Sequence, residues 1–348
     1  MSSESIPLAE NNLPPLLCEN TAGGLLHSDS RKVCPGDVFI ACPGEYADGR
    51  EYIPAAIANG AACVFWDSDG GFSWKPEWNV PNQGVANLKQ RAGILAAALY
   101  GNQQGYLKTW GVTGTNGKTS ITQWLAQAAD LLGERCAIIG TVGNGYWGKL
   151  QPTSHTTPDP VSVQTLLHGF IQDKAKAVAI EVSSHGLEQC RVNGVGFDIA
   201  VLTNLTRDHL DYHGSMESYG ESKAKLFYWQ GLQHAIINID DTFGRQLIER
   251  LRSERPQLKA YGYGFSLDAD IRITHFQAAS TGMSVVLETP WGVGEVSTRL
   301  LGRFNAQNLA ASVGVLCCSG HSLAVTLAAL AQIHPAIGRM DCIMNEDK

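Results

Sequence analysis

The stretch GVTGTNGKTS, Gly111 to Ser120, has the residue types of a phosphate-binding loop. It lies between an expected strand and an expected amphipathic helix, where backbone N–H groups and the helix N-terminus can surround phosphate oxygens. Lys118 would reach the β- and γ-phosphates, and Thr119 would offer its hydroxyl to Mg²⁺. The strict pattern G-x-x-x-x-G-K-[ST] needs glycine where Val112 stands, so a tight turn with a surface lysine is the alternative interpretation.

A second candidate is AIEVSSHG, Ala179 to Gly186, which places a glutamate at the C-terminal end of an apolar run. If that run is a parallel strand, Glu181 emerges at the sheet edge where such sheets bind ligands. A carboxylate there could hold a metal ion that bridges phosphates. A glutamate that only caps a loop is the alternative.

A third candidate is TNLTRDHLDYHG, Thr203 to Gly214, which follows another apolar run and carries two histidines and two aspartates. His209 and His213 have the spacing of a zinc-binding helix. The pattern H-E-x-x-H fails because residue 210 is leucine, and Gly214 disfavours a long helix. We therefore do not expect zinc.

The fourth segment, YGESKAKLF, carries Lys223 and Lys225 on an expected helix. Lysines on helices are normally solvated charges, and the spacing alone favours that interpretation.

Composition limits the class of protein. The 348 residues are 44% hydrophobic and 17% charged, an ordinary globular balance that suggests two or three domains. The net charge of −7 argues against a nucleic-acid binder, because no basic surplus is present to neutralise phosphates. Nine cysteines without a C-x-x-C pair indicate thiols in a reducing compartment.

The sequence also predicts a cytoplasmic protein without membrane insertion. The N-terminus lacks a basic start followed by an apolar core, so no signal peptide is expected. No apolar run approaches the roughly 20 residues that span a bilayer.

Apolar strand-like runs alternate with helical patterns along most of the chain. This alternation predicts an α/β fold with a parallel sheet covered on both faces. A β-rich passage follows YGYGF and includes a hairpin around Trp291–Gly292. The expected strands are 37–44, one through Val64 and Trp66, 106–114, 136–143, 177–184, 199–206 and 234–240; the expected helices are 52–60, 86–101, 118–133, 159–172, 241–253, 305–318 and 323–333.

Together the four segments resemble one family, the ATP-dependent Mur ligases of peptidoglycan synthesis. Their phosphate-binding loop reads T-G-T-N-G-K-T, as Thr113 to Thr119 does here, which accounts for the shifted glycine. LHSDSRKVCPGDVFIACPGEYADGREYIPAAIANGA, EVSSHGLEQCRV and NLTRDHLDYHGSMESY resemble the branch that adds the third amino acid to UDP-N-acetylmuramoyl-L-alanyl-D-glutamate. The resemblance covers almost the whole chain.

The resemblance implies a set of site residues. Glu181, His209 and Lys223 match metal ligands, together with Thr119, and Lys223 matches a lysine that carries a CO₂-derived carbamate. The family pattern Y-x-x-x-K, starting at Tyr219, selects Lys223 as the modified lysine and not its neighbour Lys225. The nucleotide would contact Gly114, Thr115, Asn116, Gly117, Lys118, Thr119, Ser120, Asn305 and Asn308; the UDP-linked substrate would contact Ser28, Ser30, Glu45, Tyr46, Ala47, His155, Thr156, Thr157, Ser183, Gln189 and Arg191. Some relatives carry asparagine where His155 stands.

The reaction implied is amide-bond formation. The glutamyl carboxylate would attack the γ-phosphate of ATP, giving an acyl phosphate and ADP, and the incoming amine would then expel phosphate. Lys118 and two Mg²⁺ ions would neutralise the developing charge. The partners implied are UDP-N-acetylmuramoyl-dipeptide and an amino acid, with diaminopimelate favoured over lysine by overall resemblance, and the protein is expected to be a monomer.

The expected domains are a UDP-substrate-binding domain at 1–105, a central ATP-binding domain at 106–337, and the start of a further domain at 338–348. Family members continue past Met340 into a Rossmann-like domain that selects the amino acid, and only eight residues follow Met340 here. The alternative to a ligase is therefore a chain that binds both ligands without turnover. A folate-polyglutamate-type ligase fails on the N-terminal unit and on EVSSHG, and a switch GTPase lacks an N-K-x-D motif.

Overall fold

The computed structural model describes residues 24–44, 47–101 and 105–336. Contacts divide them into two compact units, one comprising the residues up to 101 together with 159–165, and the other comprising 105–158 and 166–336. Within these described residues, no helix has the length and apolar character needed to cross a membrane.

The first unit is a small parallel sheet with helices and loops on its faces. Its four strands are ordered β1-β2-β3-β4 and all pairs are parallel. One core cluster joins the sheet to α2, and the other joins it to α1 and a group of aromatic residues that includes Trp66, Trp74 and Trp78. The elements are β1 (Leu26–His27), β2 (Val38–Ala41), α1 (Ile53–Ala58), β3 (Cys63–Asp67), β4 (Asn82–Val85) and α2 (Leu88–Leu99).

The second unit contains an 11-stranded sheet in the order β15-β14-β13-β12-β11-β10-β5-β9-β6-β7-β8. The strands from β6 through β13 in this order are parallel, and antiparallel strands complete both edges. The strands are β5 (Lys108–Thr113), β6 (Cys136–Gly140), β7 (Gly143–Tyr146), β8 (Lys149–Gln151), β9 (Ala177–Glu181), β10 (Ile199–Leu202), β11 (His234–Asn238), β12 (Lys259–Gly264), β13 (Ile271–Ala279), β14 (Gly282–Thr289) and β15 (Gly292–Thr298).

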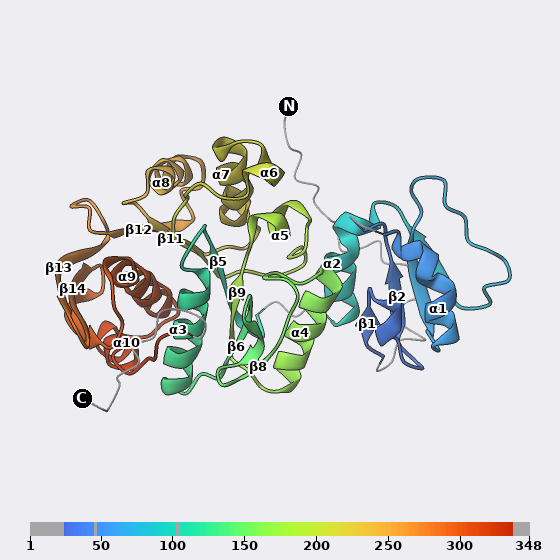
Figure 1. Ribbon diagram of the computed structural model, residues 1–348, viewed down its shortest axis with the longest axis horizontal. Coiled ribbons are helices and arrows are strands. Elements are labelled where there is room, and N and C mark those ends of the chain that lie inside the picture. Colours follow the sequence, from blue (N-terminus) through green and yellow to red (C-terminus); the bar gives the residue numbers. More distant parts are fainter. Residues whose placement is uncertain (1–23, 45–46, 102–104, 337–348) are drawn as a thin grey trace. The chain divides into compact units, whose positions relative to one another are not determined.

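Helix α3 lies in the interior of this unit, and eleven of its fourteen residues are buried. It packs on β6, β9, α9 and α10, and Figure 1 shows α3, α9 and α10 together. Helix α8 covers β11 and β12, while α5 packs on α7. The helices of this unit are α3 (Lys118–Leu131), α5 (Ser184–Glu188), α6 (Leu210–His213), α7 (Met216–Ala224), α8 (Thr242–Glu254), α9 (Arg303–Cys318) and α10 (Leu323–Leu330). Helix α4 (Pro160–Gln172) is divided between the two units, with residues up to 165 in the first.

The structure confirms the predicted α/β class, including the β-rich passage with its hairpin between β14 and β15. The sequence reading missed the edge formed by β7 and β8. Gly143 and Gly145 there have φ values of +151° and +138°, and each approaches the carbonyl oxygen of a neighbouring strand residue more closely than a side chain permits. These strands depend on glycine instead of an apolar run, so the usual strand pattern is missing.

Candidate active site

The loop between β5 and α3 has the geometry that its glycines suggest. Gly114 has φ +137° and Gly117 has φ +92°, backbone conformations that favour glycine. A Cβ on Gly114 would lie 1.8 Å from Thr203 Oγ1, and a Cβ on Gly117 would lie 2.7 Å from Asn308 Oδ1. Val112 is a buried strand residue paired with Val201 of β10. The glycine of the strict pattern is thus replaced by a residue of the central sheet.

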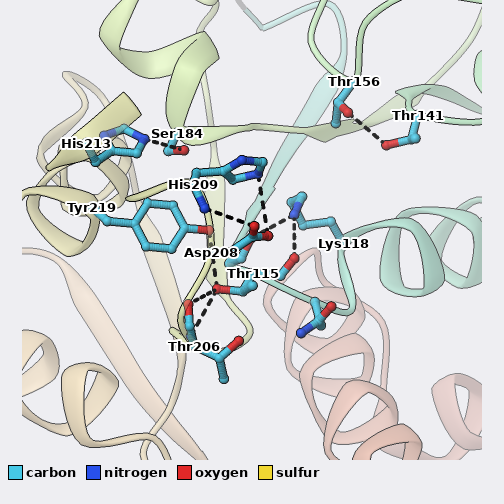
Figure 2. Close-up of polar contacts among 12 residues, drawn as sticks. Thr115, Lys118, Thr141, Thr156, Ser184, Thr206, Asp208, His209, His213 and Tyr219 are labelled. Atoms are coloured by element: carbon cyan, nitrogen blue, oxygen red, sulfur yellow. Dashed lines mark hydrogen bonds and ion pairs between the residues drawn. The ribbon is translucent and has the colours of Figure 1, made fainter. Parts of the chain in front are cut away.

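Lys118, the first residue of α3, folds back over its own loop. Its Nζ donates hydrogen bonds of 2.7 and 2.9 Å to the carbonyl oxygens of Gly114 and Thr115. Figure 2 shows Lys118 and Asp208 pointing toward one another. Asn204, beyond β10, accepts from the Thr115 N–H at its carbonyl and from the Asn116 N–H at its side chain. The loop is therefore held in place from the end of β10.

Glu181 is the last residue of β9 and is 1% exposed. Its carboxylate accepts a 2.9 Å hydrogen bond from Thr119 Oγ1, and bonds of 3.0 Å from both the backbone N–H and the hydroxyl of Thr141. Thr141 follows β6, the neighbour of β9, and was not among the predicted site residues. Hydroxyl and carboxylate oxygens therefore gather at the N-terminus of α3.

Four of the residues predicted to contact the UDP-linked substrate form a connected group beside Glu181. Thr157 Oγ1 donates 2.9 Å to the Glu181 carbonyl and lies 3.0 Å from Ser183 Oγ, which caps α5 by accepting from Gly186 N. Arg191 Nη1 donates 2.8 Å to the Thr157 carbonyl, and its Nε donates 2.9 Å to Gln189 Oε1.

Thr156 and His155, which precede Thr157, have different surroundings. Thr156 Oγ1 lies 3.0 Å from Thr141 Oγ1, and Figure 2 shows the two hydroxyls facing each other. His155 is exposed, and its Nδ1 lies 2.8 Å from Ser154 Oγ. Thr156 is thereby joined to the Glu181 group through Thr141.

Lys223 on α7 is buried, with 1% exposure, and its Nζ donates a 3.1 Å hydrogen bond to the Gly114 carbonyl. The pKa of Lys223 is lowered to about 6, mainly by burial and also by the nearby Lys118 cation, while Asp208 acts in the opposite direction. Lys225 instead lies at the surface, where it pairs with Glu188 at 2.8 Å. Of the two lysines, the structure brings Lys223 to the phosphate-binding loop.

His209 lies in a group of aromatic and imidazole rings. Its backbone has a left-handed φ of +51°, its side chain is 49% exposed, and its Nε2 lies 3.5 Å from Asp208 Oδ2. Its ring centroid lies 5.0 Å from that of His185. In the described part of the chain, no three His, Cys, Asp or Glu side chains form a ready metal cluster. A metal ion would therefore need hydroxyl, phosphate or modified-lysine oxygens as further ligands.

The remaining predicted nucleotide contacts lie on α3 and α9. Ser120 is buried in the first turn of α3. Asn308, 6% exposed, donates a 3.2 Å hydrogen bond to Asn305 Oδ1 and lies against Gly117. The two asparagines therefore present one amide pair next to the loop.

In the first unit, Ser28 Oγ donates a 2.8 Å hydrogen bond to Asp159 Oδ1. Ser30 is buried, and its carbonyl accepts from Asn59 Nδ2 at 2.9 Å. Ala47 is exposed, and its carbonyl accepts from the Gly44 N–H. Glu45 and Tyr46 lie outside the described residues.

Comparisons with known proteins place this geometry in a family. A model of the Mur ligase middle domain matches residues 112–316, and a model of the Mur ligase family, catalytic domain, matches residues 25–100. A protein of Neisseria meningitidis serogroup B named UDP-N-acetylmuramoyl-L-alanyl-D-glutamate–2,6-diaminopimelate ligase is 65% identical over 348 residues, which are 100% of this chain and 71% of that protein. A protein of the same name from Chromobacterium violaceum is 55% identical over 91% of this chain and 64% of its own length.

Solved structures agree with the sequence comparisons. A structure of a ligase with that same name is 34% identical, has a TM-score of 0.80, and is matched over 92% of this chain and 65% of its own. A MurF structure from Acinetobacter baumannii, with 20% identity and a TM-score of 0.70, shares the fold.

Proposed function

The chain belongs to the Mur ligase family, and we propose that it serves as an ATP-dependent ligase that joins diaminopimelate to UDP-N-acetylmuramoyl-L-alanyl-D-glutamate. Support comes from the 65% identity to the meningococcal protein of that name, 71% of whose length this chain spans. The observation that carries the proposal is the joining of three predicted elements at one loop: the Thr119–Glu181 pair, Lys118 and Lys223. An L-lysine-adding ligase is the alternative.

The donor atoms fit ATP with Mg²⁺. Mg²⁺ prefers oxygen ligands and is usually bound through one or two carboxylates plus substrate phosphates. Thr119 Oγ1 and the Glu181 carboxylate are such oxygens at a helix N-terminus, which itself favours phosphate. When bound, Mg²⁺ would neutralise charge on the phosphates during transfer. Two ions, with His209 as a further ligand, would extend this arrangement.

The chain's own residues would act mainly by position and charge. The glutamyl carboxylate of the substrate would attack the γ-phosphate of ATP and release ADP, and the amine would then displace phosphate from the resulting acyl phosphate. Lys118 would leave its loop carbonyls for phosphate oxygens and stabilise the transferring group. Thr156, Thr157 and Arg191 would hold the substrate so that its carboxylate is aligned with the γ-phosphate.

Lys223 would carry a carbamate. A neutral amine attacks CO₂, an N–C bond forms and one proton leaves, so a neutral group becomes an anion with two oxygens. The low pKa of Lys223 supports this, because the amine is then largely neutral near pH 7. An anion next to Lys118 would also be favoured by charge. The carbamate would thus supply a further oxygen ligand for a metal ion.

The other parts of the proposal rest on the sequence or on single contacts. The UDP end of the substrate would bind the first unit near Ser28 and Ser30, and Asn305 with Asn308 would contact the nucleotide. The domain limits at residues 105 and 337, the monomeric state and the cytoplasmic location stay predictions.

Mass spectrometry provides the direct test. The protein is incubated with UDP-N-acetylmuramoyl-L-alanyl-D-glutamate, ATP and Mg²⁺, and with diaminopimelate, L-lysine or no amine. We expect tripeptide product and ADP with diaminopimelate. Product with lysine alone would establish the alternative ligase, and ligand binding without product in any arm would contradict a catalytic role.

A further inference from the structure

Ser184, the first residue of α5, contacts two elements that lead to Lys223. Its side chain lies 2.9 Å from His213 Nε2 on α6, and its carbonyl accepts a 3.1 Å hydrogen bond from Ser222 Oγ on α7. Ser184 and Ser222 are each 1% exposed, and His213 is 9% exposed. Hydrogen bonds between buried groups are costly to lose, so these contacts fix α6 and α7 against α5.

His213 continues this connection toward the phosphate-binding loop. Its ring centroid lies 5.1 Å from that of Tyr219, which is 1% exposed. The Tyr219 hydroxyl lies 3.3 Å from Thr115 Oγ1, and Lys223 Nζ lies 4.3 Å from the centre of the Tyr219 ring. Figure 2 shows His213 pointing to Ser184 and the Tyr219 hydroxyl pointing to Thr115.

We propose that Ser184 and His213 are positioning residues, which hold α7 so that Lys223 stays at the carbonyl of Gly114. Ser184 contacts Ser222, which is next to Lys223, and His213 contacts Tyr219, which is one helical turn before Lys223. Both contacts therefore help to fix the position of Lys223. The effect of this positioning on ligation rests on the proposed function, whereas the positioning itself rests on the observed contacts. Neither residue touches the reacting atoms, so both act through Lys223.

The test measures how readily Lys223 opens to solvent. The full chain, in bicarbonate-free buffer, is treated with an amine-specific acylating reagent, and peptide mass spectrometry compares modification of Lys223 with that of exposed Lys225. Ser184→Ala and His213→Leu should each raise the relative rate at Lys223 about three- to tenfold, the effect of one lost hydrogen bond. His213→Gln, which keeps a donor and acceptor near the Nε2 position, should restore protection.

Two controls separate positioning from general destabilisation. Ser218→Ala, an exposed site on the same helix, should leave the ratio unchanged. The double variant Ser184→Ala/His213→Leu should be no worse than His213→Leu alone, because the side chains of Ser184 and His213 share one contact. An unchanged ratio in both single variants overturns the inference, as does a matching rise at every lysine. Because labelling needs no turnover, an inactive wild-type protein that shows these shifts would contradict the proposed function and support this inference.

Discussion

Gly140 lies directly against the carboxylate of Glu181: a Cβ added at Gly140 would come within 2.2 Å of Glu181 Oε1. Gly140 ends β6 and Glu181 ends β9, so two adjacent parallel strands place a bare backbone beside the buried acid. The carboxylate can then face Thr119 and Thr141. The φ of Gly140 is not in the left-handed region, so backbone conformation does not require glycine here. The nearby Glu181 carboxylate does, because it leaves no room for a Cβ.

Gly140→Ala should therefore displace Glu181. We expect a loss of about 1–3 kcal/mol in the free energy of unfolding, the usual cost of overpacking, and weaker Mg²⁺ dependence of nucleotide binding. Urea unfolding and Mg²⁺ titrations measure the two effects. Gly169→Ala is the control, because that exposed glycine of α4 has nothing within 4 Å of an added Cβ. Equal behaviour of both variants would contradict the steric argument.

Thr119→Val should weaken nucleotide binding through the metal. Valine keeps the shape but removes the hydroxyl that faces Glu181. We expect nucleotide affinity in Mg²⁺ to fall about tenfold or more, while affinity for the UDP-linked dipeptide changes little. Calorimetry with each ligand makes the comparison. Thr122→Val is the matched control, since the Thr122 hydroxyl donates to carbonyl oxygens of its own helix. If Thr119→Val weakened the binding of both ligands equally, the variant would be misfolded.

Lys223 and Lys225 should behave differently on removal. Lys223→Ala should reduce ligation by at least about a hundredfold, with partial rescue by a small added carboxylate, because it removes a buried group at the loop. Lys225→Ala should cost at most about 1 kcal/mol of stability, the upper range for an exposed ion pair. Rate measurements that found the two variants alike would show that the register is wrong. Intact-mass spectra in bicarbonate should show the carbamate on Lys223.

Lys223 also predicts a pH dependence of stability. Its folded pKa is about 6, below the usual 10.5, so between these values the unfolded chain binds more protons than the folded chain. In bicarbonate-free buffer, this group should make the free energy of unfolding rise with pH from about 6 upward. Lys223→Met should remove that part of the slope. Parallel slopes for the two proteins, from urea unfolding at several pH values, would contradict a neutral buried amine.

The sequence predicted the strand ends that carry the site, because apolar runs followed by polar residues mark the edge of a parallel sheet. Glu181 and the loop after β5 lie at that edge, as expected. Lys223 was distinguished from Lys225 by family register alone, since helix spacing predicted surface charge for both. Its burial follows from how α7 packs on α5, which local sequence does not encode.

Other parts of the site depend on contacts between distant segments. Thr141 follows a glycine at the end of β6, and only the pairing of β6 with β9 brings it to Glu181. The sequence signal that could have identified Thr141 as a site residue is its position directly after an expected parallel strand. Tyr219 was used only to set register, yet its hydroxyl reaches Thr115 across 104 positions of sequence. Pairings of this kind cannot be read from spacing.

Arg191→Lys should weaken binding of the UDP-linked dipeptide without weakening binding of the nucleotide. The guanidinium is oriented by two partners, the Thr157 carbonyl at 2.8 Å and Gln189 Oε1 at 2.9 Å, which leaves its fork fixed beside Ser183 and Thr157. A lysine keeps the charge but cannot make these directed bonds together, and it cannot bind a carboxylate or phosphate in a bidentate manner.

We expect affinity for the UDP-linked dipeptide to fall about tenfold, with nucleotide affinity unchanged, as measured by calorimetry at matched salt. Arg135→Lys is the control, because Arg135 is exposed and contacts Tyr146 and the Asp173 carbonyl, neither of which is a proposed site residue. Full retention of dipeptide affinity in Arg191→Lys would mean that the arginine only braces Thr157. In that case Arg191→Ala should lower stability without a selective effect on either ligand, since the role would be structural.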